Sequence, residues 1–194
     1  MSTIKPILLA LTFAGVVWLA FGGLRSQPDT MLKAGASEVQ TARPLQLDSP
    51  AIADYRNWSR EPSHFGAFAV SDTGGSGWVS DYNEIGMAEA AALAYCGAPD
   101  CRVIARSLPV SKPEEGVLLV SRASAEAFKE YLTLPGTKAY AVHGSGAGGS
   151  WINARWVFQA KRGAIRECEF RLIDWEKPPP GISGDCQVVH VSRR

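Results

Sequence analysis

The chain of 194 residues is long enough for one medium domain, or for a small domain with a tether. Its hydrophobic content of 46%, with six Trp, five Tyr and seven Phe, excludes a chain that is disordered throughout. The 19 acidic and 20 basic residues give a net charge of +1, which does not favour nucleic-acid binding because such binding needs a concentrated basic field.

The first predicted element is the apolar segment 6–24, which contains no charged side chain. As a helix it spans about 28 Å, close to the hydrocarbon thickness of a bilayer. The alternative is a cleaved signal peptide, but the apolar region of such peptides is usually shorter, and Phe21 and Trp18 make a poor cleavage site. Residues 1–24 are therefore predicted to form a membrane anchor or signal segment, and either way the rest of the chain is expected to be exported.

Residues 25–63 contain four prolines, several polar residues and no sustained hydrophobic periodicity. This composition predicts a linker that holds the following domain away from the membrane, with a short helix near 31–42 as a local alternative. The folded domain is predicted over 64–194.

Hydrophobic alternation and turn residues place the elements of this domain. Strands are predicted at 65–71, 78–82, 101–108, 116–120, 138–143, 151–159, 164–173 and 187–192. Helices are predicted at 84–95, capped by Asn83 and ended by Gly97, and at 124–132. The pattern predicts an α+β fold with a mostly antiparallel sheet and two short helices, preceded by the N-terminal hydrophobic helix and its tether.

Two segments of the domain are similar to each other. An apolar strand, a Gly-rich turn and a Trp occur over 68–78 and again over 139–151. Because the second copy is predicted to continue into strands and not into a helix, the similarity is interpreted as two related hairpins and not as a duplicated domain.

Four cysteines in an exported chain predict two disulfides. Three connectivities are possible, and local pairing of Cys96 with Cys101 and of Cys168 with Cys186 is favoured because each pair flanks an evident turn. A zinc site of four thiolates is the alternative, but the second spacing is wider than zinc knuckles use. The cysteines fit an oxidising periplasm best.

Two motifs that are associated with chemistry are interpreted as turns. The run Gly144-x-Gly146-x-x-Gly149 formally matches a dinucleotide-binding motif, but a strand is predicted after it where that motif needs a helix. Asp72-Thr73-Gly74 is also found in aspartic proteases, whose chemistry needs two carboxylates that share a proton. No second segment of that kind is present, and the residues are typical of a turn.

The histidines and their neighbours predict no catalytic or metal site. His64, His143 and His190 have no helical ligand spacing, although folding could still bring them together. Ser145 or Ser150 beside His143 suggests a nucleophile, but the strand–elbow–helix motif of serine hydrolases is missing. No catalytic residue, cofactor or metal is therefore assigned.

Trp151 and Trp156 are the candidate contacts with a protein partner. Five positions apart on a predicted strand, they are expected to face opposite sides, one in the core and one exposed. An exposed Trp suits a protein interface because aromatic anchors carry interface energy. Packing under a loop is the alternative.

A family resemblance covers about residues 65–105. The residues that carry it are FGAFAV at 65–70, Gly77-Trp78, AEAAAL at 88–93, Cys96 and DCRV at 100–103. This pattern of a hairpin, an Ala-rich helix that ends in Cys and a Cys that opens the next strand resembles domain of unknown function 4189, an uncharacterised exported bacterial family. Such domains usually carry a further Cys-rich strand, whereas 104–112 has none. The resemblance implies an exported, disulfide-stapled small domain and no known catalytic activity.

Together these features predict a non-catalytic, membrane-anchored periplasmic binding or accessory protein, such as a small subunit that stabilises a larger membrane or envelope complex. The expected location is the inner membrane, single-pass, with the C-terminal domain in the periplasm, or the soluble periplasm if the segment is cleaved. The alternative functions are a small periplasmic hydrolase and a soluble periplasmic ligand-binding protein.

Overall fold

The computed structural model describes residues 30–42, 49–112, 114–173 and 184–193, and these residues form four helices and nine strands. In chain order the elements are β1 (Met31–Lys33), β2 (Ser37–Thr41), α1 (Ser49–Arg60), β3 (Phe65–Val70), β4 (Ser76–Tyr82), α2 (Ile85–Cys96), β5 (Arg102–Pro109), β6 (Val117–Leu119), α3 (Arg122–Thr133), β7 (Thr137–Val142), β8 (Gly148–Trp151), α4 (Val157–Ile173) and β9 (Gln187–Arg193). The fold is α+β with mostly antiparallel pairing, as predicted, but it has four helices and not two.

The predicted N-terminal hydrophobic helix lies outside the described residues. Within the ranges that the structure describes, no helix is long and apolar enough to cross a membrane.

The first structural unit consists of β3, β4, α2 and β5. Strands β3 and β4 form a hairpin, α2 follows, and β5 returns to pair antiparallel with the other edge of β3. One face of β3 presents the fully buried Ala67 and Ala69 to α2, which meets them with Ala88 and Ala92. These small side chains allow the helix to lie close to the sheet. The opposite face of β3 presents Phe68 to α1.

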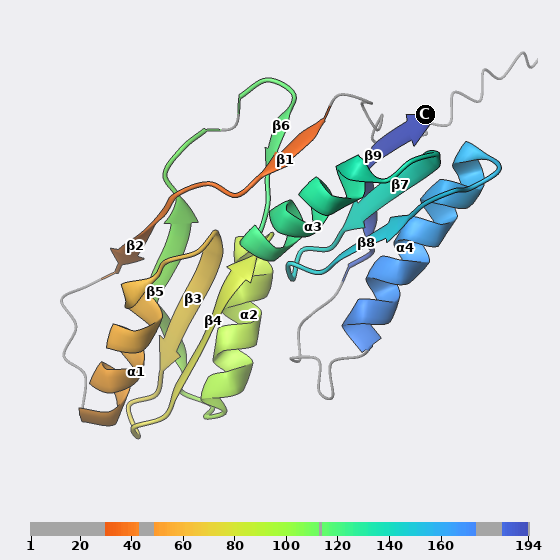
Figure 1. Ribbon diagram of the computed structural model, residues 1–194. Coiled ribbons are helices and arrows are strands. Elements are labelled where there is room, and N and C mark those ends of the chain that lie inside the picture. The colour runs from red at the N-terminus through yellow and green to blue at the C-terminus, as the bar shows by residue number, and fades with distance from the viewer. Residues whose placement is uncertain (1–29, 43–48, 113, 174–183, 194) are drawn as a thin grey trace, which may run out of the picture.

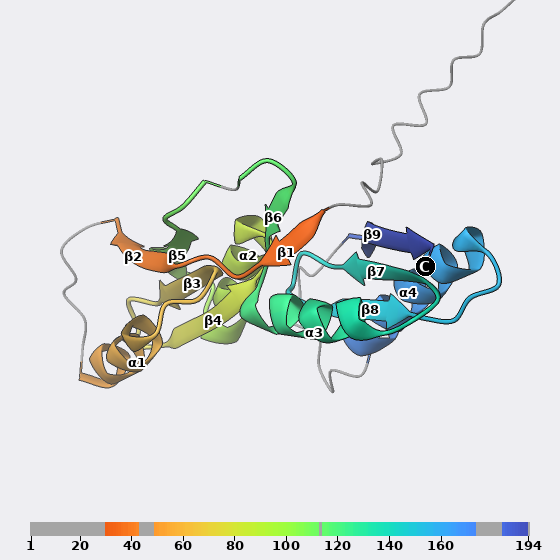
Figure 2. The same ribbon diagram turned by 45° about the horizontal axis from the view of Figure 1, so that its top comes forward.

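Strands β7, β8 and β9 with α4 repeat this arrangement. The strand order β8-β7-β9 matches the order β4-β3-β5 of the first unit. Ala139 and Ala141 face α4, whereas Tyr140 faces α3 on the other side of the sheet. The two units lie side by side (Figure 1), and the short strands β1 and β6 lie between the two sheets (Figure 2).

The two units correspond residue by residue from the hairpin through the helix. Gly77 pairs with Ala69, and Gly149 pairs with Ala141, so the two glycines hold the same position in their hairpins. Each residue of the first unit therefore corresponds to the residue 72 positions later in the second unit. A Cβ atom added at Gly77 would lie 2.1 Å from the backbone nitrogen of Cys96, and one at Gly149 would lie 2.2 Å from that of Cys168. The same close approach of strand and helix therefore exists twice. The expectation of two related hairpins without a duplicated unit is wrong.

The second unit was obscured in the sequence because α4 does not show a clear helical pattern. The predicted strands at 151–159 and 164–173 are wrong, since 157–173 forms one helix. Its buried side consists of Ala160, Ala164 and Cys168, which recur every four residues and have no exposed surface. Small residues give a weak hydrophobic signal, and the exposed aromatic residues of α4 add an apparent alternation of period two.

The prediction that residues 25–63 form a linker is wrong for the part of this range that the structure describes. Strand β2 pairs antiparallel with β5 and extends the first sheet. In α1, Trp58 is buried against Phe68, and its indole N–H donates to the carbonyl oxygen of Val79 at 3.0 Å. Residues 37–41 and 49–60 are thus part of the folded domain.

Both disulfides pair as the sequence predicts. The Cα atoms are 6.2 Å apart in Cys96–Cys101 and 6.1 Å apart in Cys168–Cys186, within the usual range. In each unit the bridge joins the helix to the residue that precedes the last strand. Disulfides persist in oxidising environments, so they indicate an extracytoplasmic compartment.

Candidate functional site

A stripe of large side chains runs along the outward face of α4. Phe158, Arg162, Arg166 and Phe170 follow one another at intervals of four residues, which places them in one row. The two phenylalanine residues are 65% and 60% exposed. The row therefore lies on the side of the helix opposite to the alanines that pack on the sheet.

Trp151 forms one wall beside this stripe. It ends β8, and its ring lies against Gly163 of α4 so closely that a Cβ atom at Gly163 would be 2.3 Å from the ring. The absence of a side chain at Gly163 thus lets the indole lie on the helix, where it remains 46% exposed.

Trp151 and the stripe enclose an open groove of about 760 Å³. The residues that line it come from the end of β8, the following loop and the outer side of α4: Trp151, Asn153, Ala154, Arg155, Phe158, Gln159, Arg162, Gly163, Arg166, Glu167 and Phe170. Trp156, which is 54% exposed, stacks under the guanidinium of Arg155 at 5.4 Å. The α4 groove, as we call it, thus combines exposed aromatic rings with three arginines.

The α4 groove carries a surplus of positive charge. Arg155, Arg162 and Arg166 contribute three positive charges and Glu167 one negative charge. Among the described residues, none of these three arginines forms an ion pair with a carboxylate. Their guanidinium groups are therefore available to an external anion.

The first unit shows that folding does not require this stripe. With the shift of 72 positions, Phe158, Arg162 and Arg166 correspond to Gly86, Ala90 and Ala94 of α2, all of them small. Because α2 packs on its sheet in the same way as α4, the large side chains of α4 are not needed for that packing.

Of the two predicted contact residues, Trp151 lines the α4 groove, whereas Trp156 lies beside it and contacts Arg155, which lines it. The predicted placement of the two residues on one strand is wrong. Trp151 ends β8 and Trp156 lies just before α4, so they are not on opposite faces of one strand, and both are exposed. The sequence reasoning missed the phenylalanine and arginine residues of the stripe. Their regular spacing of four could have revealed it once the segment was read as a helix.

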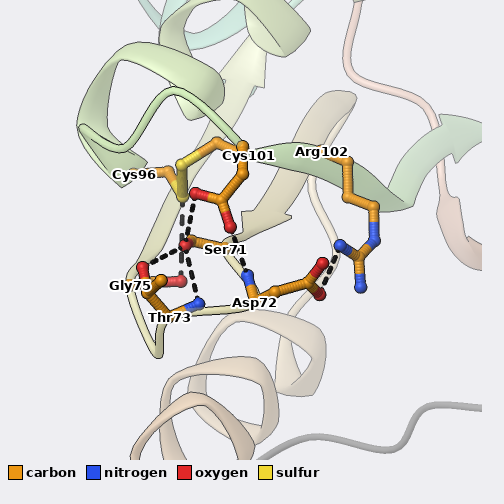
Figure 3. Close-up of polar contacts among 8 residues, drawn as sticks. Ser71, Asp72, Thr73, Gly75, Cys96, Cys101 and Arg102 are labelled. Atoms are coloured by element: carbon orange, nitrogen blue, oxygen red, sulfur yellow. Dashed lines mark hydrogen bonds and ion pairs between the residues drawn. A yellow bond between two sulfur atoms is a disulfide. The ribbon is translucent and has the colours of Figure 1, made fainter.

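The Asp72-Thr73-Gly74 segment forms the β3–β4 turn, as predicted. The amide N–H of Thr73 donates to the Ser71 hydroxyl oxygen at 3.0 Å, and the Ser71 hydroxyl donates to Asp100 at 2.7 Å (Figure 3). The Ser71 hydroxyl bond, together with the amide N–H of Asp72, lowers the pKa of the Asp100 carboxyl. Asp72 pairs with Arg102 at 2.5 Å. These contacts connect the turn to the disulfide loop, and Asp72 is engaged in an ion pair.

The corresponding turn of the second unit contains a buried Ser–His pair. The amide N–H of Ser145 donates to Nδ1 of His143 at 3.1 Å, and the Ser145 hydroxyl lies 2.8 Å from the same nitrogen. Because Nδ1 accepts an amide N–H, the imidazole proton is on Nε2, which donates to the carbonyl oxygen of Gly184 at 3.2 Å. Such a pair is a nucleophile–base arrangement in hydrolases. Here both side chains are buried, and their bonds close the turn, so the geometry does not favour catalysis.

The glycines of the dinucleotide-like motif belong to the same hairpin. Residues 143–147 form the turn between β7 and β8, and Gly148 and Gly149 lie in β8. The strand predicted after the motif is wrong, because the chain continues from β8 through a short loop into α4 at Val157. The last glycine of the motif nevertheless lies inside β8 and not at the start of α4, so its amide is not at a helix N-terminus.

The three histidines lie in separate environments. The His64 ring packs at a tilt against the Phe65 ring, with 4.7 Å between the ring centroids. His143 lies in the β7–β8 turn, and His190 contacts the Tyr131 hydroxyl at 2.8 Å. Within the described part of the chain, no group of three or more His, Cys, Asp or Glu side chains could hold a metal ion.

Comparison with protein families, curated proteins and solved structures finds no significant match to the chain. The resemblance to domain of unknown function 4189 stays a prediction from the residues that carry it.

Proposed function

We propose that this protein is a non-catalytic binding protein, anchored in the inner membrane by residues 6–24, with its disulfide-bonded domain in the periplasm. There it acts as an accessory subunit of a larger membrane or envelope complex and docks through the α4 groove. The observation that carries the proposal is the row of exposed Phe158 and Phe170 around Arg162 and Arg166, which have no carboxylate partner among the described residues.

Two further observations support a docking role. The corresponding positions of α2 are small, so the aromatic and basic side chains of α4 are an addition that folding does not need. Exposed aromatic and arginine side chains are the residues that dominate binding energy at protein interfaces.

The test is to solubilise the membranes mildly, separate the intact complexes under native conditions, and follow the migration of this protein. The wild type is compared with variants. The wild type is expected to travel with a large complex, and the F158A/F170A variant is expected to run as the free protein. Y95A is the matched control, because Tyr95 is also an exposed aromatic residue, 54% exposed, on the corresponding helix α2. This variant should keep the association.

Two results would contradict the proposal. Wild-type protein that migrates alone would exclude the accessory role. Association that survives in the F158A/F170A variant would place the docking surface elsewhere. A hydrolytic activity of the purified protein that is lost on H143N or D72N would instead support the hydrolase alternative.

A further inference from the structure

We infer that the α4 groove binds an extended acidic segment of a partner protein, in which two carboxylates on alternate residues are flanked by apolar side chains. The inference rests on the proposed function and adds the chemistry of the partner.

The charge of the α4 groove selects an anionic ligand. Arg162 and Arg166 project from adjacent turns of α4, and neither has a carboxylate partner among the described residues. Arg155 adds a third cation from the loop before the helix. The planar fork of an arginine binds a carboxylate with two parallel hydrogen bonds, which are stronger than those between neutral groups.

The row on α4 also sets the spacing of the ligand. The helical rise of about 1.5 Å per residue puts Phe158, Arg162, Arg166 and Phe170 about 6 Å apart along the axis. In an extended chain, alternate side chains on one face are about 6.6 Å apart. A seven-residue segment can therefore present four side chains in register with the row, apolar at its two ends and acidic at the two positions between them.

The α4 groove is an open concave surface of about 760 Å³, a size that suits a short peptide segment. A concave surface is a poor match for a flat bilayer, so a peptide fits better than a lipid surface.

The test is selection of displayed random twelve-residue peptides on the oxidised full-length protein in mild detergent. Counter-selection uses the F158A/R162A/R166A variant, whose outer helical face resembles that of α2. The enriched peptides should carry two Asp or Glu residues on alternate positions with apolar residues on both sides. For an enriched peptide, replacing both acidic residues by Gln or Asn should weaken binding at least ten-fold. R162A/R166A should weaken it to the same extent, and Y95A should not.

Several results would overturn the inference. These are the absence of any peptide that distinguishes the wild type from the variant, enrichment of neutral or basic peptides, and equal affinity for the acidic peptide and its amide counterpart. Stripe-dependent binding to phosphatidylglycerol vesicles without peptide enrichment would assign the surface to lipid. If the native complex depends on Phe158 and Phe170 while peptide selection shows no acidic preference, only this inference fails; if no native complex exists, the proposed function fails.

Discussion

Ser71 and His143 hold the same position in the two hairpins and perform the same task with different atoms. The Ser71 hydroxyl oxygen accepts the amide N–H of the residue two positions later at 3.0 Å, and His143 Nδ1 does so at 3.1 Å. Both turns then place a glycine at positive φ, Gly74 at 97° and Gly146 at 92°. A side chain that would suggest catalysis in isolation is thus explained by its counterpart in the other unit.

Gly77 and Gly149 should be intolerant of any side chain. A Cβ atom would come within 2.2 Å of the helix backbone at either position, and backbone cannot move aside as a flexible side chain does. We expect G77A and G149A each to lower the free energy of unfolding by at least about 3 kcal/mol or to prevent folding, as overpacking does at its upper range. Urea unfolding measures the effect.

Gly86→Ala is the matched control for those variants. It lies in α2 with no atom within 4 Å of the added Cβ, so the replacement should raise stability by about 0.5–1 kcal/mol. Stability of G77A equal to that of G86A would contradict the close approach of β4 and α2.

The two disulfides should contribute unequally. Their sequence separations are 18 for Cys168–Cys186 and 5 for Cys96–Cys101. In the chain-entropy description, loops of these sizes give about 3 and 2 kcal/mol. The C168S/C186S variant should therefore lose more stability than C96S/C101S in denaturant unfolding. In C168S alone, Cys186 should become reactive to alkylation; a protected Cys186 would indicate a different connectivity.

Lys138 should be important for stability although it is charged and buried. Its ammonium group donates to the carbonyl oxygens of Tyr131 at 2.9 Å and Leu132 at 2.8 Å, and also to that of Leu134, at the end of α3. K138M leaves these acceptors without their donor, and each unsatisfied buried group costs about 1–3 kcal/mol. We expect a loss of at least about 3 kcal/mol in thermal or urea unfolding. As a control, K129M replaces an exposed lysine of α3 and should change stability by less than about 0.5 kcal/mol.

His64 should make stability depend on pH below neutrality. It is buried, and neither ring nitrogen has a hydrogen-bond partner among the described residues. Burial lowers the pKa of its imidazole from 6.5, while the nearby Asp81 carboxylate acts in the opposite direction. As pH falls below 6.5, the unfolded chain binds a proton before the folded protein does, so the free energy of unfolding decreases.

Comparison of the wild type with H64F isolates this effect. The stability difference between the two should change by at most about 1.4 kcal/mol per pH unit below pH 6.5, and H64F should be relatively more stable at the lower pH. Urea unfolding at several values between pH 5 and 8 measures it. Parallel pH profiles would show that the imidazole is not kept neutral by burial.

The outer face of α4 should contribute little to stability. The F158A/R162A/R166A variant introduces side chains about as small as those of α2, and its free energy of unfolding should stay within about 1 kcal/mol of the wild type. A large loss would mean that the stripe packs within the chain and is not available to a partner.

The local features of the chain were predictable because they depend on neighbouring residues. The first unit follows from an apolar run at 65–70, an Ala-rich helix and its end at Gly97, which adopts a left-handed φ of 73°. The disulfides follow from short spacings around turns. By contrast, Asn83 does not cap α2: its side chain bonds the carbonyl of His143 and the amide of Ser121, which are distant in sequence.

The tertiary structure alone decided which apolar residues are exposed. Hydrophobicity does not distinguish an aromatic residue that packs in the core from one left on the surface. Ala160 and Ala164 are buried while Phe158 and Phe170 are exposed, because the sheet requires small side chains where α4 approaches the strands. The sequence by itself determined the local turns, the pairing of cysteines and the α+β class; the duplicated unit and the α4 groove depend on contacts between distant residues, which no local pattern encodes.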